Sequence, residues 1–237
     1  MNGTVLEAYI TNLGKYNEGK FVGAPLKFPT TPEAVQEVLK RIGIDGIRYE
    51  EIFITSFESD VLGLYDHLGE YENLDELNHL ACLLSELDKN QLEVFEAVID
   101  KGDHTSCAAD LINLAQNLDC YDYHPGVEDE EALGRVYVED MGAIDVPEHL
   151  RNYFDYEAYG RDVSLEEDGY FSKGGYLVYT GGFQELYQGI EDIPDEQRVF
   201  AMPRLSIREQ LAAYQGIVDR SSLQGERQHP SVGREDR

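Results

Sequence analysis

The residues best suited to chemistry lie together in one stretch, Asp119-Cys120-Tyr121-Asp122-Tyr123-His124. Carboxylate, thiolate and imidazole groups are the side chains that hold zinc in proteins. Zinc ligands come in pairs of fixed spacing, whereas these donors follow one another directly. The stretch is more typical of a tyrosine-rich strand that turns at Pro125-Gly126. A metal-dependent enzyme is an alternative interpretation, and it requires tight, stoichiometric metal binding.

A second candidate is the acidic run Glu128-Asp129-Glu130-Glu131. It lacks the register and the glycine of an EF-hand calcium loop. Acidic residues at the start of a helix are favoured by the helix dipole, so the run predicts a helix N-terminus. Phosphate-binding, dinucleotide-binding, zinc-protease and nucleophile-elbow motifs are absent, and the six histidines are scattered. We therefore expect no catalytic residue, no cofactor and no metal, and a protein that is not an enzyme.

The net charge of −28 is unevenly distributed along the 237 residues. Residues 1–48 have a net charge of +1, whereas residues 49–148 carry 26 Asp and Glu against Lys89, Lys101 and Arg135, a net of −23. We call residues 49–148 the acidic block. Such a charge repels phosphates and anionic lipids, so nucleic acid and membranes are not expected as direct partners.

The acidic block has the pattern of a folded scaffold. Apolar residues recur at helical spacing over 74–87, 91–101 and 105–118, with acids at the positions between them. The short links predict a small antiparallel helix bundle. Mounting so many like charges on a compact body costs stability through self-repulsion. Because this loss of stability is confined to one part of the chain, it favours an acidic surface that has a function. The alternative is a solvated face without a function.

The rest of the chain is predicted to form small flanking modules. Residues 4–11, 21–28 and 48–57 have strand patterns, the last with alternating faces. A turn-rich segment, 12–20, joins the first two, and Thr31-Pro32 opens a helix to about Ile42. Three strands and one helix make an α+β module. Further along, 129–141 and 147–159 are predicted helices, and 169–180 resembles a glycine-turned hairpin.

The C-terminal fifth of the chain differs in charge. Residues 188–237 hold seven arginines and no lysine. A helix is expected over 204–220, and Arg220 to Arg237 has the composition of a disordered tail. This extension either folds back on the acidic body or stays loosely attached. Three cysteines without a C-x-x-C pair and the lack of a signal-like N-terminus or a long apolar run predict a cytoplasmic protein with reduced thiols.

Two segments, YITNLGKYNEGKFVG at 9–23 and NYFDYEAYGRD at 152–162, resemble the ArdA antirestriction proteins of conjugative plasmids and transposons. The resemblance covers about residues 4–180, including LDELNHLACLLSEL at 74–87, and the extension from about Gln188 departs from it. It implies an elongated α+β protein of three small domains, paired into a homodimer. We expect an N-terminal α+β domain at 1–60, an acidic helical domain at 61–118, a mixed helix and strand domain at 119–187, and the extension at 188–237.

The resemblance also implies the function. Such proteins occupy the DNA-binding groove of type I restriction-modification enzymes as DNA mimics, so an incoming unmethylated element escapes cleavage. Twenty acids of the block are the expected partner-binding surface: Asp66, Glu70, Glu72, Asp75, Glu76, Glu86, Asp88, Glu93, Glu96, Asp100, Asp103, Asp110, Asp119, Asp122, Glu128, Asp129, Glu130, Glu131, Glu139 and Asp140.

The second segment corresponds to the antirestriction motif of that family. It comprises Asn152, Tyr153, Phe154, Asp155, Tyr156, Glu157, Ala158, Tyr159, Gly160, Arg161 and Asp162. Its aromatic residues do not imitate phosphate, and Arg161 has the wrong sign. We expect this segment to pack the C-terminal domain or the dimer seam. The alternative function for the chain is an acidic adaptor or chaperone for a basic DNA-associated protein, which need not compete with DNA for its partner's groove.

Overall fold

The computed structural model describes residues 4–226. Its strands are β1 Leu6–Asn12, β2 Gly23–Phe28, β3 Ile52–Ser59, β4 Tyr121–Pro125, β5 Tyr170–Ser172 and β6 Gly175–Tyr179. Its α-helices are α1 Leu13–Asn17, α2 Pro32–Ile42, α3 Leu74–Glu86, α4 Lys89–Lys101, α5 Ala108–Ala115, α6 Glu130–Arg135, α7 Tyr156–Glu166 and α8 Ile207–Glu226.

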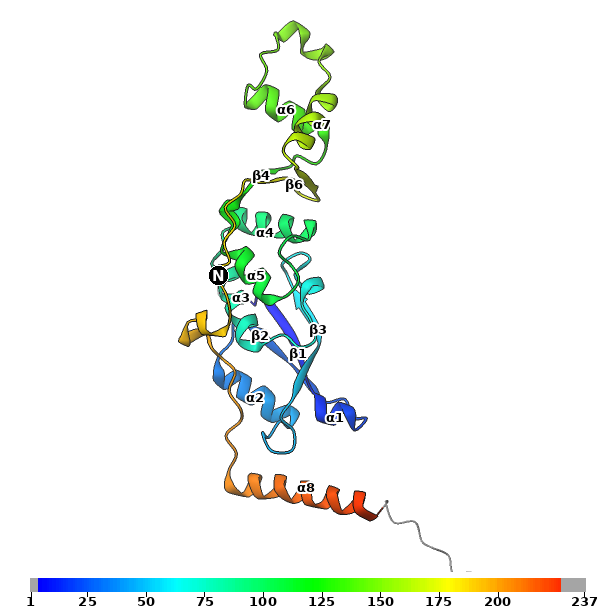
Figure 1. Cartoon of the computed structure of the whole chain (residues 1–237), viewed down its shortest axis with the longest axis vertical. Helices are drawn as coiled ribbons and strands as arrows, with labels where there is room; N and C mark the ends of the chain where they lie inside the picture. Colours follow the sequence, from blue (N-terminus) through cyan, green and yellow to red (C-terminus); the bar gives the residue numbers. More distant parts are fainter. Residues whose placement is uncertain (1–3, 227–237) are drawn as a thin grey trace, which may run out of the picture.

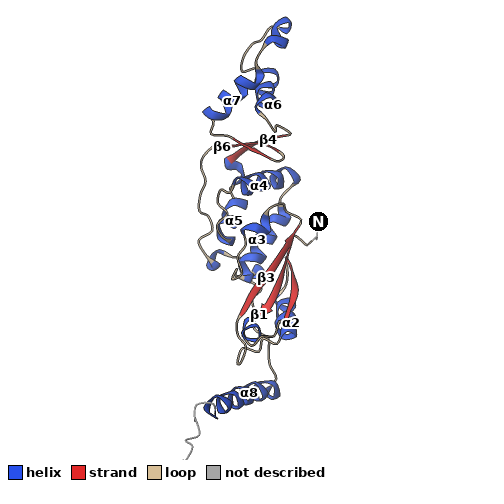
Figure 2. Cartoon of the chain, turned by 90° about the vertical axis from the view of Figure 1, so that its right-hand side faces the viewer, coloured by secondary structure: helices blue, strands red, loops and turns tan. Residues whose placement is uncertain are grey.

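These elements succeed one another along a single long axis, so the molecule is elongated (Figure 1). Helix α8 lies at one end and the pair α6 and α7 lies at the other. Between them come the β1–β3 sheet with α2, then α3 to α5, and then the second small sheet (Figure 2). The mixed α and β content and the elongated shape agree with the sequence.

The N-terminal sheet has the antiparallel order β2-β1-β3. Helix α2 starts as predicted: the Thr31 hydroxyl accepts a hydrogen bond from the Ala34 amide at 3.3 Å, and Pro32 needs no partner at the first position. It buries Val35 and Leu39 in the core of this end of the molecule. Gly43 ends the helix in the left-handed conformation that glycine adopts freely, with φ of +81°.

Two predictions for this region were wrong. The segment 12–20 contains helix α1, capped by the side chain of Asn12. The third strand begins at Ile52, because Asp45 accepts hydrogen bonds from three successive amides, those of residues 47–49, and holds that stretch in a turn. Phe53 and Ile54 are both buried, on opposite faces of the strand: Ile54 lies in the large core, whereas Phe53 packs edge-on against Tyr16 at a centroid distance of 5.1 Å.

The three helices predicted within residues 74–118 of the acidic block form where the periodicity places them. Leu77, Leu80 and Leu84 of α3 are buried, as are Phe95 and Val98 of α4. Helix α3 packs on α5, whereas α4 also lies against β5 and β6. These helices therefore support the second sheet in addition to packing on one another.

The second sheet has the antiparallel order β4-β6-β5 and separates two cores. Adjacent residues of β6 point to opposite faces: Leu177 belongs to the large core, and Tyr176 belongs to a small core with Leu133 and Val163. The large core runs without a break from β1 through α3–α5 to Val199. The first two predicted domains thus share one core, and the division at residues 60, 118 and 187 stays a prediction.

The region beyond β4 corrects one predicted helix. Helix α6 continues as a π-helical turn, Val136–Asp140, close to the predicted 129–141. The helix predicted at 147–159 was wrong. Pro147 precedes a 3₁₀ turn, Glu148–Tyr153, and α7 starts only at Tyr156 because the Asp155 side chain caps it by accepting the Ala158 amide at 3.0 Å.

The extension folds back onto the acidic body. Tyr187, Ile193 and Val199 are buried in the large core, so the chain after β6 runs along α5 and α3 before it reaches α8 (Figure 2). We call residues 183–200 the strap. Helix α8 continues to Glu226, so the disorder expected from Arg220 onward was wrong for 220–226, and 227–237 lies outside the described residues.

Candidate partner-binding surface and the motif helices

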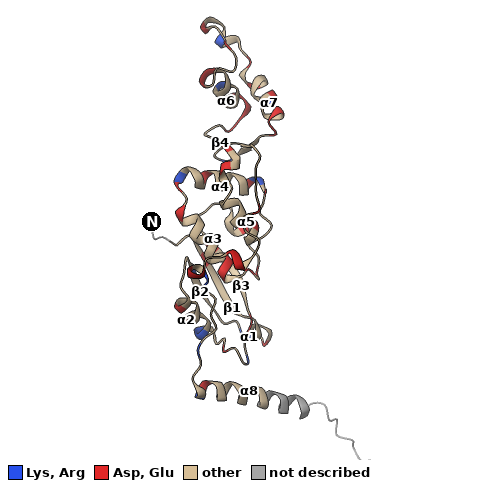
Figure 3. Cartoon of the chain, turned by 60° about the vertical axis from the view of Figure 1, so that its left-hand side comes forward, with Lys and Arg blue, Asp and Glu red and all other residues tan. Residues whose placement is uncertain are grey.

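None of the twenty acids expected at the partner surface is buried. Twelve are exposed: Asp66, Glu70, Glu86, Asp88, Asp100, Asp119, Asp122, Glu128, Asp129, Glu131, Glu139 and Asp140. Eight are half-buried: Glu72, Asp75, Glu76, Glu93, Glu96, Asp103, Asp110 and Glu130. Acidic positions occur over most of the long axis, from the β3 end to α6 and α7 (Figure 3). The surface is therefore long and negative, and no small set of acids converges on one point.

The three basic residues of the acidic block are each paired with an acid close in sequence. Lys89 lies 3.1 Å from Glu93, and Lys101 lies 2.8 Å from Asp103. Arg135 lies 2.8 Å from Glu131 and 3.5 Å from Glu139. Exposed pairs of this kind add little stability because water screens them. Their effect on the surface is to leave no cation of the block presented alone to a partner.

Two of the expected surface acids contact the strap instead. The Asp75 carboxylate accepts hydrogen bonds from the amides of Val199 and Phe200, at 2.6 and 2.7 Å. The Glu76 carboxylate accepts one from the Tyr187 hydroxyl at 2.7 Å. Burial and this acceptor raise the pKa of Tyr187, because the ionised phenol would lie beside a second negative charge. Asp75 and Glu76 thus have structural contacts within the chain that the sequence did not reveal.

The strap is attached mainly through side-chain amides on α5 and just beyond it. Asn113 donates to the Tyr187 carbonyl and accepts from the Tyr187 amide, both at 2.9 Å. Asn117 makes the same two contacts with Gln184, both at 2.9 Å. Each amide thus pairs with the backbone as a neighbouring strand would. Buried Asn residues four apart on an apolar helix face were the signal in the sequence, and our interpretation missed it.

A third amide holds the far end of the strap. Asn78 of α3 accepts from the Thr30 amide at 2.7 Å and donates to the Gln197 carbonyl at 2.8 Å. Its neighbour His79 contacts the Gln197 side chain. The side-chain nitrogen of Asn78 and the His79 ring find their partners in the strap, so Asn78 links the strap to the segment after β2.

Several other acids of the surface also accept hydrogen bonds from backbone amides. Asp88 and Asp129 cap α4 and α6, accepting the amides of Gln91 and Ala132. Glu96 accepts the Leu62 amide at 3.0 Å. Acids with such contacts keep a negative charge at the surface while they fix the local fold.

The motif residues 152–162 start at the 3₁₀ turn and continue into α7, which lies against α6. Two glycines allow the helices to approach to backbone contact: a Cβ on Gly134 would collide with the Tyr156 carbonyl, and one on Gly160 would collide with the Glu130 carbonyl. Gly160 is thus a packing residue of the motif.

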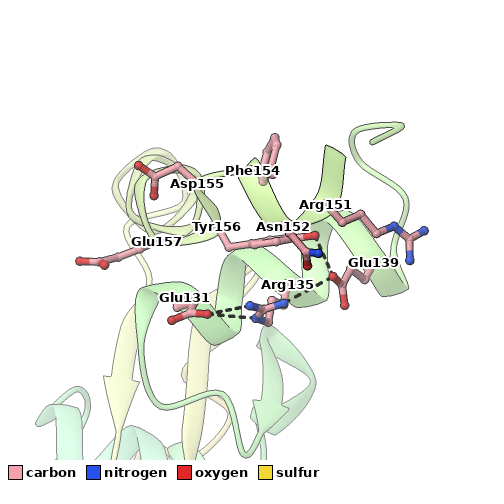
Figure 4. A pocket seen from close by; sticks show the side chains of 9 residues that line it. All are labelled: Glu131, Arg135, Glu139, Arg151, Asn152, Phe154, Asp155, Tyr156 and Glu157. Atoms are coloured by element: carbon pink, nitrogen blue, oxygen red, sulfur yellow. Dashed lines mark hydrogen bonds and ion pairs between the residues drawn. The ribbon is translucent and has the colours of Figure 1, made fainter. Parts of the chain in front are cut away.

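Tyr156 lies at the centre of this contact (Figure 4). Its buried ring lies under the Arg135 guanidinium, 4.4 Å from the ring centroid, and its hydroxyl donates to Glu139 at 2.8 Å. That hydrogen bond and desolvation raise the pKa of Tyr156. Phe154 packs edge-on against Tyr156 and Tyr159, at centroid distances of 5.0 and 6.0 Å.

The other motif residues are more open to solvent. Asn152, Tyr153, Asp155, Glu157, Arg161 and Asp162 are exposed, and Ala158 is half-buried. Together with α6, the motif lines a shallow polar cleft in which acids alternate with Arg135 and Arg151 (Figure 4). The residues that line it include no histidine, cysteine, serine or lysine.

Residues 121–124 of the cluster lie in strand β4, as the tyrosine-rich pattern predicts, whereas Asp119 and Cys120 belong to the preceding 3₁₀ turn, Leu118–Cys120. Asp119 and Asp122 are exposed, whereas Cys120 is buried and its pKa is raised by that burial. His124 faces Tyr176 and Tyr137 at ring distances of 6.3 and 6.4 Å. Between residues 4 and 226, no three His, Cys, Asp or Glu side chains come together in an arrangement that could hold a metal ion.

In the same range, no helix is both long and apolar enough to cross a membrane. Comparison with curated proteins gives no match. The family model described as antirestriction protein (ArdA) matches residues 8–178, which is well over half of the chain and ends just before the strap. The protein therefore belongs to the ArdA antirestriction family.

Proposed function

We propose that this antirestriction protein acts as a DNA mimic that occupies the DNA-binding groove of a type I restriction-modification enzyme, without catalysing a reaction. The carrying observation is the long surface of twenty unburied acids on a folded body, with the three cations of the block each paired to an acid. A groove built for phosphates would meet carboxylates at similar density.

The magnitude of the charge supports this proposal. Duplex DNA carries one charge per ~1.7 Å of axis, so the net −23 of the acidic block corresponds to the phosphates of roughly 12 base pairs. Neighbouring carboxylates on a helix face have Cβ atoms about 5–6 Å apart, which is near the spacing of phosphates along one strand. Attraction between such a surface and a basic groove acts over a long range and weakens with salt.

A homodimer would double the length of the mimic. We place its seam at the tip, which we define as residues 141–154 at the α6 and α7 end of the molecule. Apolar side chains gather there in solvent: Tyr153 is 86% exposed, and Met141, Ile144 and Leu150 are also exposed. Exposed apolar patches of this kind mark contacts between proteins. Protection of an incoming mobile element in the cytoplasm of a new host is the corresponding biological role.

The test is cleavage of an unmodified plasmid by a purified type I restriction enzyme as this protein is titrated in at about 0.15 M salt, near the physiological value. We expect inhibition near stoichiometric ratios, relieved by competitor DNA or by higher salt. Inhibition that persists with saturating competitor DNA would contradict mimicry and favour the acidic adaptor. The absence of inhibition with several such enzymes would contradict the proposed partner.

Two variants that each lose four negative charges distinguish the effect of a DNA-like surface from the effect of net charge. One variant replaces four exposed acids of the block by amides, at Glu86, Asp119, Asp122 and Glu128. Its control replaces four exposed acids outside the block, at Glu33, Glu37, Glu191 and Glu196. The first should weaken inhibition and the second should not. Because an exposed charge contributes about 1 kcal/mol or less, any one of these changes alone should have little effect.

A further inference from the structure

Helix α8 contacts the body of the protein through one narrow face. Glu209 lies 3.4 Å from Lys40 of α2, Ala213 is buried, and Gly216 lies under Arg48, whose Nη1 atom would be 3.0 Å from a Cβ on that glycine. These three positions are spaced four and three residues apart, so they share one side of the helix. The body-facing side thus includes two small residues and an ion pair.

The start of α8 is fixed by a reciprocal cap. The Glu209 carboxylate accepts from the amide and the hydroxyl of Ser206, both at 2.8 Å, and the Ser206 hydroxyl accepts the Glu209 amide. These bonds, together with Lys40, lower the pKa of Glu209 to about 2. The cap and the ion pair together set which side of α8 faces away from the body.

That outward side carries an apolar stripe, which we define as Ile207, Leu211 and Tyr214. Their spacing of four and then three residues places them about 180° around the helix from Glu209, Ala213 and Gly216. They are 78%, 64% and 57% exposed. Three large apolar side chains on one outward face are more than solubility or helix formation requires.

We infer that the apolar stripe is the contact surface for α8 of a second copy of this chain. A four-three spacing of apolar residues is the seam of two helices that pack along each other, and two identical stripes form a self-complementary contact. Two copies that pack through this helix are related by one two-fold axis. Each stripe is then covered by the other, so no third molecule is required.

Charge favours this occupant over others. Residues 200–226 carry Arg204, Arg208 and Arg220 against Glu209, Asp219 and Glu226, a net of zero in a chain of net −28. Two copies that approach through their acidic bodies repel each other strongly, whereas two copies that meet through the neutral α8 hold those bodies further apart and repel each other less. A strongly basic partner would bind to the acids of the body, because a helix of zero net charge offers it no favourable charge interaction.

The contact would join molecules end to end. Helix α8 lies at the opposite end of the long axis from the tip (Figure 1), so pairing at α8 leaves the tip and the acidic block open. This inference does not rest on the proposed function, because it uses only the stripe, its orientation and its charge. It would lengthen the negative surface beyond that of one molecule.

The test is sedimentation equilibrium of the full chain over a range of concentrations. Leu211→Glu places a charge in the stripe, and its matched control Ala212→Glu places the same charge on the next residue, 100° away around the helix. We expect the mass of Leu211→Glu at high concentration to stay below that of the wild type, because the variant has lost one two-fold contact. Ala212→Glu should keep the wild-type mass.

The salt dependence of self-association is a second measurement, and its direction can be predicted. Screening of the repulsion between two bodies of net −28 should strengthen association through α8 as NaCl rises, whereas binding to a basic groove weakens. Equal mass of wild type and Leu211→Glu at every concentration and salt would overturn the inference, with circular dichroism confirming that both are folded. If Leu211→Glu does not fold, Leu211→Ser decides in the same way.

Discussion

Gly134 of α6 and Gly160 of α7 face each other so closely that neither position has room for a Cβ. The backbone of each helix fills the space where the other would carry a side chain. This contact sets the distance between the two helices, and hence the position of Tyr156 under Arg135. Gly160 therefore contributes to the motif by its lack of a side chain.

Gly160→Ala should destabilise the α6–α7 end of the molecule. Alanine favours a helix by about 1 kcal/mol over glycine, but the added methyl group collides with the Glu130 carbonyl, and overpacking of this kind costs about 1–3 kcal/mol. Urea unfolding should therefore show a net loss of stability. Gly69→Ala, where a Cβ meets only the end of the Glu72 side chain at 3.4 Å, is the control and should change little. A Gly160→Ala protein as stable as wild type would contradict the packing role.

Asn113→Ala should loosen the strap. The substitution leaves the amide and the carbonyl of Tyr187 without their partner, and an unsatisfied buried polar group costs about 1–3 kcal/mol. Hydrogen exchange should accelerate around residue 187 while the β1–β3 sheet keeps its protection. The exposed Asn152→Ala is the matched control. Unchanged exchange in the strap of Asn113→Ala would show that the amide contacts do not hold it.

The Tyr187–Glu76 contact should make stability fall at alkaline pH. The pKa of Tyr187 is raised in the folded protein, so its contribution is fully present below the unfolded value near 10. The contribution is lost as the pH rises through the folded pKa. Absorbance titration of the phenolates should show that Tyr187→Phe removes one late-titrating tyrosine. Tyr121, Tyr137 and Tyr176 also have raised pKa values, so the readout is the difference between variant and wild type.

The sequence predicted the elements whose signals are local. Thr31 and Pro32 located the start of α2, and the apolar period of α3 identified Leu77, Leu80 and Leu84 as buried. The helix expected at 147–159 failed because Pro147 was taken as the first-turn signal, whereas the capping residue is Asp155.

Long-range contacts explain what the sequence did not reveal. The strap contains only short 3₁₀ turns, and its partners on α3 and α5 lie more than sixty residues away along the chain, as Asn113 does from Tyr187. The exposure of the acids followed from helical spacing, but the contacts of Asp75 and Glu76 with the strap depend on tertiary structure. Which acids a partner touches stays a prediction.

Two of the three tyrosines of the motif, Tyr153 and Tyr156, should have opposite effects when they are changed. Tyr153 is 86% exposed at the tip, so Tyr153→Ser should leave the free energy of unfolding unchanged. It should nevertheless weaken self-association, because the ring belongs to the proposed dimer seam. Tyr156→Phe keeps the buried ring but loses the hydrogen bond to Glu139, which should cost about 1 kcal/mol of stability, with little change in self-association.

Sedimentation and urea unfolding of both tyrosine variants, made in the Leu211→Glu background, exclude any contribution from α8. Loss of the dimer in Tyr153→Ser with wild-type stability would support the seam at the tip. An intact dimer in that variant would place the seam elsewhere, because no other residue of the motif exposes so large an aromatic surface.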